Sequence, residues 1–288
     1  MTGVAIVGQD LILTFSCPDR PGLAYAVAGF VLQHSGNVLE SQQYNDTVTD
    51  RFFMRVEFTV PSDDVDRIRQ QFLPLAERHS MQWRLSPARQ PVRAVILVSK
   101  EGHCLNDLLY RCGNGTMNMT VAAVAGNHRT LDQLSRGHGV ELHHIPTPAG
   151  RKGETEDAIR HLVEETNADL VILARYMQIL SPELCRDLAG RAVNIHHSFL
   201  PSFAGARPYH QAYERGVKLV GATAHYVTAD LDEGPIIEQD VMRVAHHSTP
   251  AELAAAGRDV ETQVLARAVR WHCEQRVLLN GLRTVVFN

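Results

Sequence analysis

The chain has 288 residues, of which 44% are hydrophobic and 21% are charged, and its formal net charge is −4. This composition is ordinary for a soluble globular protein with one large domain or two ordinary ones. The slightly acidic balance gives no reason to expect nucleic acid or an anionic membrane surface as a partner.

Three further features indicate a cytoplasmic protein. The longest apolar runs, such as residues 121–126, are far too short to span a bilayer. The first ten residues lack the basic region and the apolar core of a signal peptide. The five cysteines are odd in number and include no CxxC pair, which is typical of reduced thiols rather than of a disulfide framework.

Residues 1–86 have the pattern of a small α+β domain. Apolar side chains alternate where strands are expected and recur at helical spacing where helices are expected. In chain order the pattern predicts strand, helix, strand, strand, helix and strand, near residues 11–15, 23–31, 38–44, 54–60, 62–75 and 80–85. This order is the βαββαβ arrangement of a ferredoxin-like fold.

A second domain is expected over residues 93–288, after a proline-containing linker at residues 87–92. Short apolar runs alternate there with helical stretches, which predicts βαβ units and a Rossmann-like, mostly parallel sheet. The fold class is therefore α/β. Strands are expected at residues 94–98, 121–124, 170–173 and 191–195, an antiparallel edge pair at 222–228 and 235–241, and a closing helix over 250–279.

The stretch "VNIHHSFLP" (residues 193–201) places an amide and an imidazole at the end of an expected core strand. Ligands of open α/β sheets bind outside the carboxyl ends of the strands. The Asn194 amide can donate to an oxyanion, and histidine, the residue type at position 196, is one that exchanges protons near neutral pH. Asp232, in the turn "DLDEGP", could orient the imidazole. Spacing leaves two interpretations open, a shared site or a polar strand end with a separate capped turn.

The sequence predicts no metal site. It contains no HExxH motif and no other ligand set with fixed helical spacing. His196 and His197 are adjacent, so on a strand they are expected to point to opposite faces. The stretch "SKEGHC" (residues 99–104) lacks the glycines of a phosphate-binding loop, and Cys104 is expected to be a buried helix thiol rather than a nucleophile.

The segment "VNIHHSFLPSFAGARPYHQAYERGVKLVGATAHYVTADLDEGPIIEQD" resembles the catalytic core of the folate-dependent formyl transfer family. That family carries the motif N-I-H-x-S-x-L-P-x-F and a distant aspartate. The motif falls on Asn194, His196, Ser198, Pro201 and Phe203, and the aspartate falls on Asp232. The resemblance covers roughly residues 92–288 and implies that Asn194, His196 and Asp232 are catalytic.

The resemblance also implies how the folate is held. The stretch "LARYMQILS" (residues 173–181) is similar to the loop that surrounds the pterin ring, and His225 is a secondary catalytic candidate whose alternative role is that of a hydrogen-bonded strand histidine. The folate itself is the substrate, so no cofactor is implied. The residues implied in folate binding are Arg175, Tyr176, Met177, Gln178, Ile179, Leu180, Val227, Thr228 and Asp230.

The N-terminal stretch "CPDRPGLAYAVAGFVLQHSGNVLES" (residues 17–41) resembles an ACT domain. Such domains pair with one another and bind small effectors such as amino acids at their interfaces. The resemblance implies an effector near Asp19, Gly22 and Asn37, and a homo-oligomer, either a dimer or a tetramer. A domain that only oligomerises is the alternative.

An ACT domain ahead of a formyl transfer domain is the arrangement of the deformylase branch of the family. That branch hydrolyses 10-formyltetrahydrofolate to tetrahydrofolate and formate, which supplies formate to purine synthesis and balances the one-carbon pool. The missing phosphate loop and His197, which stands where transferases have proline, also favour hydrolysis. Two alternatives remain, transfer to an amine as in glycinamide ribonucleotide formyltransferase, and a folate- or amino-acid-sensing module with a decayed site.

Overall fold

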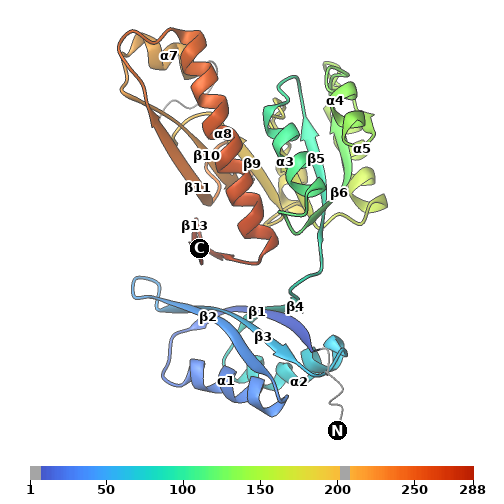
Figure 1. Ribbon diagram of the computed structural model, residues 1–288, viewed down its shortest axis with the longest axis vertical. Helices are drawn as coiled ribbons and strands as arrows, with labels where there is room; N and C mark the ends of the chain where they lie inside the picture. The colour runs from blue at the N-terminus through green and yellow to red at the C-terminus, as the bar shows by residue number, and fades with distance from the viewer. Residues whose placement is uncertain (1–7, 202–207) are drawn as a thin grey trace. The chain divides into compact units, whose positions relative to one another are not determined.

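The computed structural model describes residues 8–201 and 208–288, so Phe203 of the expected motif lies outside the described residues. Its contacts divide the chain into two compact units, one formed by the residues up to Gln90 with parts of the C-terminal segment, and one formed by Pro91–Cys273 with Gly281–Thr284 (Figure 1). The last strand of the first sheet, β4, ends at Pro87, and the first strand of the second sheet, β5, begins at Val92. Each unit is described separately below.

The first unit contains a four-stranded antiparallel sheet and two helices. The strands lie in the order β2-β3-β1-β4. Their bounds are β1 (Gln9–Pro18), β2 (Asn37–Asp46), β3 (Arg51–Val60) and β4 (Gln82–Pro87), with α1 (Leu23–Gln33) after β1 and α2 (Val65–Arg78) after β3. The βαββαβ order expected from the sequence is confirmed.

The core of this unit lies between the sheet and its two helices, which cover the same face (Figure 1). Leu11, Leu13 and Phe15 alternate along β1 and are almost completely buried. They meet the apolar stripe of α2, which includes Ile68 and Phe72. Alternation on the strand and a stripe of 3.6-residue period on the helix are what make this face apolar.

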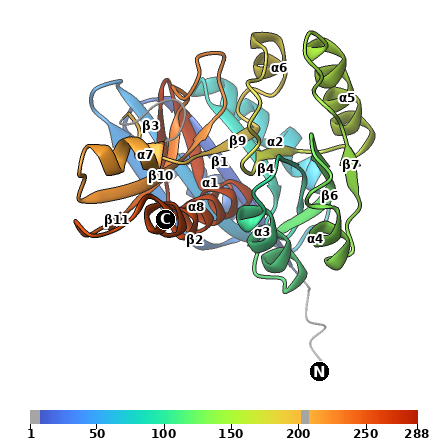
Figure 2. The same ribbon diagram turned by 90° about the horizontal axis from the view of Figure 1, so that it is seen from above.

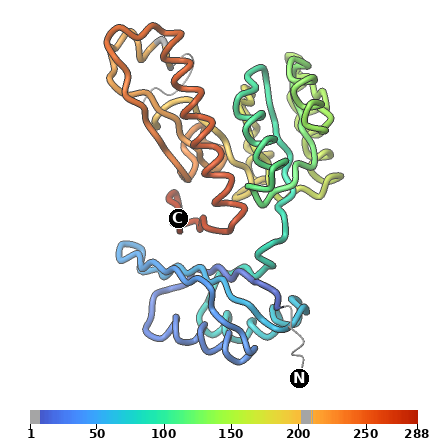
Figure 3. Tube along the Cα trace, in the orientation of Figure 1, coloured from blue at the N-terminus to red at the C-terminus, as the bar shows by residue number. Residues whose placement is uncertain are grey.

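The end of the chain differs from the prediction. Helix α8 (Pro250–Cys273) stops at Cys273 rather than continuing to residue 279. Gln275 has a φ of 54°, in the left-handed region, so the helix ends before it. Beyond the end of the helix (Figure 3), strands β12 (Val277–Asn280) and β13 (Arg283–Val286) form a two-stranded sheet. The turn between them, residues 281–282, follows Asn280 directly, and an Asn-Gly pair is a strong hairpin signal.

Part of this C-terminal segment belongs to the first unit. The contacts assign Glu274–Asn280 and Val285–Asn288 to it, whereas the sequence-based bounds placed all of residues 93–288 in the second domain. Arg276 forms an ion pair with Glu40 at 3.1 Å, and the Asn280 amide donates to Asp46. Polar contacts of this kind leave no apolar periodicity in the sequence, so the pattern did not reveal them.

The second unit is built on a seven-stranded sheet in the order β11-β10-β9-β8-β5-β6-β7. The ladders from β9 to β7 are parallel, and β10 pairs antiparallel with both β9 and β11. The strands are β5 (Val92–Val98), β6 (Met119–Gly126), β7 (Leu142–His144), β8 (Leu170–Leu173), β9 (Ala192–His196), β10 (Leu219–Tyr226) and β11 (Ile236–Arg243). The predicted mostly parallel sheet with an antiparallel edge pair is confirmed.

Helices cover both faces of this sheet, with α3 and α8 on one side and α5 and α6 on the other (Figure 2). Strand β5 is therefore buried from Ala94 to Val98 and reads as a continuous apolar run. In the sheet, β6 lies on one side of β5 and β8 lies on the other, so the order of strands reverses at β5. Such a reversal creates a crevice at the carboxyl ends of the strands. The helices are α3 (His103–Gly113), α4 (Asp132–Gly137), α5 (Lys152–Glu165), α6 (Pro182–Asp187), α7 (Pro208–Glu214) and α8.

Among the described residues, none of the helices combines the length and the apolar character needed to cross a membrane.

Candidate functional site

A cavity of about 330 Å³ opens beyond the carboxyl ends of β8 and β9. It is lined by two continuous segments, residues 175–180 and 227–232, and by Asn194, His196 and His225 among others. All the residues that the resemblance assigns to catalysis and to folate binding therefore lie around one cavity. The sequence left open whether Asp232 meets the strand end, and the structure places it there.

Sheet geometry brings the polar side chains of the strands together. Asn194 and His196 are two residues apart on β9, so they project from the same face. His225 on β10 is the antiparallel partner of Asn194 in the register, which puts its side chain on that face as well. All three stand at the end of β9, where the strand leaves the core.

His196 and Asp232 form the central pair. Nδ1 of His196 lies 3.2 Å from Oδ1 of Asp232, and both side chains are largely buried. The hydrogen bond from His196 lowers the pKa of Asp232 below its usual value, so the carboxylate is ionised at neutral pH. Nε2 of His196 is buried and has no hydrogen-bond partner among the described residues. This arrangement favours a proton on Nδ1 and leaves the Nε2 lone pair free.

A tight turn holds Asp232 in place. Asp232 has a φ of 60°, a left-handed conformation that asparagine and aspartate adopt more readily than most residues. At Gly234, just before β11, a Cβ atom would lie only 1.7 Å from the carbonyl oxygen of Tyr226, so only glycine fits where the turn passes the end of β10. The "DLDEGP" turn therefore has backbone requirements at two positions, and both serve to bring the carboxylate to His196.

His225 is oriented toward Asn194. Its Nδ1 lies 2.9 Å from the carbonyl oxygen of Tyr226, to which it donates, so Nε2 carries a lone pair. That atom accepts from Nδ2 of Asn194 at 3.2 Å. Burial lowers the pKa of His225, which keeps the ring neutral near pH 7. One amide proton of Asn194 is used in this bond, and the second is left to donate to a ligand.

His197 does not point away from His196 as expected. Strand β9 ends at His196, so the alternation of faces stops there, and the two ring centroids lie 5.2 Å apart. Both residues line the cavity, and the ring of His197 also lies near that of Tyr209. Desolvation, followed by the charge of Arg175, lowers the pKa of His197 to about 4. His197 is therefore a neutral wall of the cavity at physiological pH.

The neutral His197 predicts an acid-sensitive stability. In the folded protein its pKa is about 4, whereas the unfolded chain takes up the proton below the ordinary value of 6.5. Stability is thus lost as the pH falls through this window, and from pH 7 to pH 5 the loss from this group is about 2 kcal/mol. Urea unfolding at both pH values should show that His197→Phe removes this part of the loss. The matched variant His161→Gln, at a side chain that is 71% exposed, should keep it, and equal pH dependence in wild type and His197→Phe would contradict the assignment.

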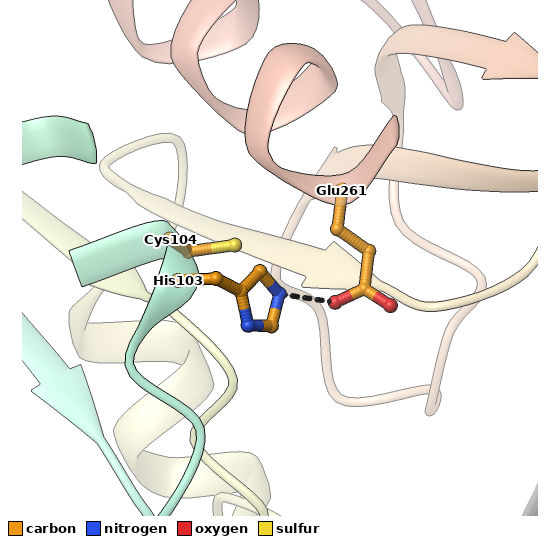
Figure 4. A group of neighbouring side chains, drawn as sticks. All are labelled: His103, Cys104 and Glu261. Carbon is orange, nitrogen blue, oxygen red and sulfur yellow. Dashed lines mark hydrogen bonds and ion pairs between the residues drawn. The ribbon is translucent and has the colours of Figure 1, made fainter. Parts of the chain in front are cut away.

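A second buried polar cluster lies beside the cavity and contains His103, Cys104 and Glu261 (Figure 4). Their potential ligand atoms lie within 4.8 Å of one another. The donor set nevertheless suits hydrogen bonding better than a metal. Burial raises the pKa of the Cys104 thiol, so the thiolate that a metal needs is disfavoured, and Arg175 already places a cation 3.3 Å from Glu261. Cys104 is 1% exposed on α3, as expected for a structural thiol.

Sequence patterns did not single out Glu261 and Tyr209. Glu261 is a charged residue within the buried stripe of α8, between Val260 and Val264, and it is completely buried. A carboxylate on an apolar helix face is rarely left without partners. The position of Glu261 in the apolar stripe could have indicated a buried, partnered carboxylate. It could not have indicated that Tyr209, on a different helix, is one of the partners.

The three positions expected to bind an effector lie in the first unit. Asp19 follows β1 and accepts a hydrogen bond from Asn45. Gly22 has a φ of 93° and precedes α1, a conformation that favours glycine. Asn37 is the exposed first residue of β2. Their role in effector binding stays a prediction.

Comparison with known families identifies both units. Residues 92–269 match the family described as Formyl transferase, and residues 9–86 match the ACT domain family.

The chain is also similar to individual proteins over nearly its whole length. It is 49% identical to a formyltetrahydrofolate deformylase of Corynebacterium sp. strain P-1, with 96% of this chain and 97% of that protein covered. It is 44% identical to the formyltetrahydrofolate deformylase of Bacillus subtilis strain 168, with 96% and 93% covered.

Solved structures show the same relation. A crystal structure of a formyltetrahydrofolate deformylase from Pseudomonas syringae pv. tomato has a TM-score of 0.94 at 45% identity, covering 99% of this chain and 97% of that one. Glycinamide ribonucleotide transformylase 1 from Symbiobacterium toebii has a TM-score of 0.67 at 30% identity, covering 71% of this chain and 98% of that one. The second likeness spans a smaller share of this chain than the first.

Proposed function

The chain belongs to the formyltetrahydrofolate deformylase family, and we propose that it hydrolyses 10-formyltetrahydrofolate to tetrahydrofolate and formate. The observation that carries this proposal is the His196–Asp232 pair. Nδ1 of His196 contacts the ionised carboxylate of Asp232, while the buried Nε2 has no hydrogen-bond partner among the described residues. His196 also lines the cavity. A histidine in this state is suited to accept a proton from water.

In the first step, water adds to the formyl carbon. Nε2 of His196 accepts a proton from the water as its oxygen forms the new bond. Asp232 stabilises the resulting imidazolium through the 3.2 Å contact to Nδ1. The formyl oxygen becomes an oxyanion, and the free amide proton of Asn194 donates to it.

In the second step, the carbon–nitrogen bond breaks. The imidazolium of His196 returns its proton to the departing N10 nitrogen, so the electron pair of the broken bond ends on a neutral amine. Formic acid and tetrahydrofolate are the products with one water consumed, and the acid then releases its proton to solvent to give formate. Every group in this sequence comes from the chain or from water, and we propose no metal or cofactor.

His225 has a supporting role in this scheme. It accepts one amide proton of Asn194 at 3.2 Å and is itself fixed by the carbonyl oxygen of Tyr226. These two bonds orient the amide before the oxyanion forms, which is the condition for effective electrostatic stabilisation. His225 therefore acts through Asn194 rather than on the formyl group.

The folate is held by the two segments that line the cavity, residues 175–180 and 227–232. Their apolar members, such as Leu180 and Val227, suit the faces of a pterin ring, while polar groups of the same segments fix its edge. The backbone amide of Met177 already donates to Ser99 at 2.9 Å, which fixes that part of the wall.

An assay with one substrate tests the reaction type. We expect purified protein to release formate and tetrahydrofolate in equal amounts from 10-formyltetrahydrofolate without an added amine. Formation of product only when an amine such as glycinamide ribonucleotide is present would favour a formyltransferase. Tight folate binding without any turnover would indicate a binding module.

Several finer points belong to the same proposal. The formate would supply purine synthesis, and its release would balance the one-carbon pool in the cytoplasm.

The ACT unit would bind an amino acid near Asp19, Gly22 and Asn37, at an interface between copies of a homo-oligomer. ACT domain membership supports this assignment. Formate release measured with and without methionine or glycine tests it, and an unchanged rate with both would argue for a domain that only oligomerises.

A further inference from the structure

Arg175 has an unusual backbone at the start of the cavity wall. It follows β8 by two residues and begins the segment 175–180 that lines the cavity. Its φ is 64°, in the left-handed region, which for a side chain without a short polar group costs about 1–2 kcal/mol. Such a conformation persists only where the surroundings hold it.

Glu261 of α8 is the group that meets this side chain. Its carboxylate is 1% exposed, and Oε2 lies 3.3 Å from Nε of Arg175. The contact is an ion pair without hydrogen-bond geometry, since Nε and Nη1 of Arg175 are buried with no hydrogen-bond partner among the described residues. Glu261 therefore supplies the negative charge that faces these two buried nitrogens.

Two other donors hold the Glu261 carboxylate itself. Nε2 of His103 lies 2.8 Å from Oε2, a contact drawn as the dashed line in Figure 4, and the hydroxyl of Tyr209 donates to Oε1 at 2.5 Å. Burial alone would raise the pKa of Glu261, but His103, Arg175 and Tyr209 together lower it, so the group is ionised. Gly257, one turn earlier on α8, leaves the room that the Tyr209 ring fills.

The other end of the segment is held in a similar way. Glu156 of α5 is also buried, and it accepts from the backbone amide of Ser181 at 2.7 Å and from the Ser181 hydroxyl. Two buried glutamates, one from a helix on each face of the sheet, thus fix the two ends of the wall. Backbone amides on either side of Arg175 are hydrogen-bonded, from Ala174 to Leu97 and from Met177 to Ser99, while the Arg175 side chain itself is held by the ion pair to Glu261.

We propose that Glu261 is a positioning residue for folate binding, because it holds Arg175 in the left-handed conformation and so sets the shape of segment 175–180. This proposal rests on the proposed function. It concerns the affinity for the folate rather than the chemical step, since Glu261 touches Arg175, His103 and Tyr209 and not the reacting groups.

A double-mutant cycle tests the proposal. Glu261→Gln, Arg175→Gly and the double variant are compared in KM and kcat for 10-formyltetrahydrofolate. Glu261→Gln should raise KM about tenfold with kcat changed less than about threefold, and it should have little further effect in the Arg175→Gly background, where glycine adopts a positive φ without strain. An equal effect in both backgrounds, an unchanged KM or a loss confined to kcat would overturn it.

A second comparison avoids the buried charge. Arg175→Ala and Arg175→Gly both remove the guanidinium group, but only glycine accepts the backbone conformation, so the alanine variant should bind the folate about tenfold more weakly. Equal affinities would overturn the proposal. The control is Glu238→Gln, which removes an ion pair to Arg267 of α8, the helix that carries Glu261. This variant should leave KM unchanged. Tetrahydrofolate binding is measured in parallel, so that absence of turnover in the wild type is recognised as a failure of the proposed function instead.

Discussion

Replacing Asp232 by asparagine should reduce formate release by about a thousandfold or more, while tetrahydrofolate binding stays within a few-fold of wild type. The carboxylate accepts from Nδ1 of His196 at 3.2 Å and favours the tautomer with a free lone pair on Nε2. An asparagine amide can donate to Nδ1 instead, which would place the proton on Nε2 and remove the base. Formate release and equilibrium binding of tetrahydrofolate, measured on the same preparation, check both parts.

The control for this variant is Glu233→Gln. Glu233 is the next residue in the turn, is exposed and does not line the cavity, so its charge can be removed without touching the His196–Asp232 pair. It should turn over like the wild type. Near-normal formate release by Asp232→Asn would remove the aspartate from the mechanism, whereas a loss in both variants would indicate damage to the turn.

Replacing Asn194 by alanine should lower kcat by about a hundred- to a thousandfold, because one donor to the oxyanion is lost. KM should change much less, since the bond strengthens only as charge develops on the formyl oxygen. Single-turnover measurements of formate release separate the chemical step from binding and product release.

The neighbouring His225 offers an internal comparison for Asn194. His225→Ala removes the acceptor that orients the amide at 3.2 Å and leaves Asn194 itself in place. It should therefore cost less than Asn194→Ala, about tenfold, and the double variant should be no slower than Asn194→Ala alone. A fully additive double variant would show that His225 acts on the formyl group independently of Asn194.

Much of the fold followed from periodicity. Alternation along β1 and β3 and the stripes of α1 and α2 predicted the βαββαβ unit, and short apolar runs alternating with helical stretches predicted the mostly parallel sheet of the second unit. These signals are strong because burial on one face or on both leaves a direct trace in the order of apolar residues.

Errors arose where local backbone geometry decided the outcome. The helix over 250–279 was extended past Cys273 because apolar residues continue, although the Asn-Gly pair at residues 280–281 indicates a hairpin. His197 was expected on the opposite face from His196 because the strand was expected to continue, and β9 ends at His196. Neither stop is visible in hydrophobic periodicity.

The sequence predicted which residues belong to the candidate site, but it did not show that they meet in space. Asn194 and His196 share a face by strand geometry, which the sequence predicts once β9 is placed. Asp232 arrives through a turn with a positive φ at its own position and a glycine that no other residue can replace at 234, and spacing alone does not show where such a turn leads. Glu261 was missed because its partners come from three separate elements.

Hydrolysis in water enriched in oxygen-18 tests the central claim most directly, because it follows the nucleophile itself. If water activated by His196 attacks the formyl carbon, the formate released from unlabelled 10-formyltetrahydrofolate carries one labelled oxygen, and Asp232→Asn yields almost none in the same time. Formate without the label, or a formyl group recovered on an amine, would contradict the account.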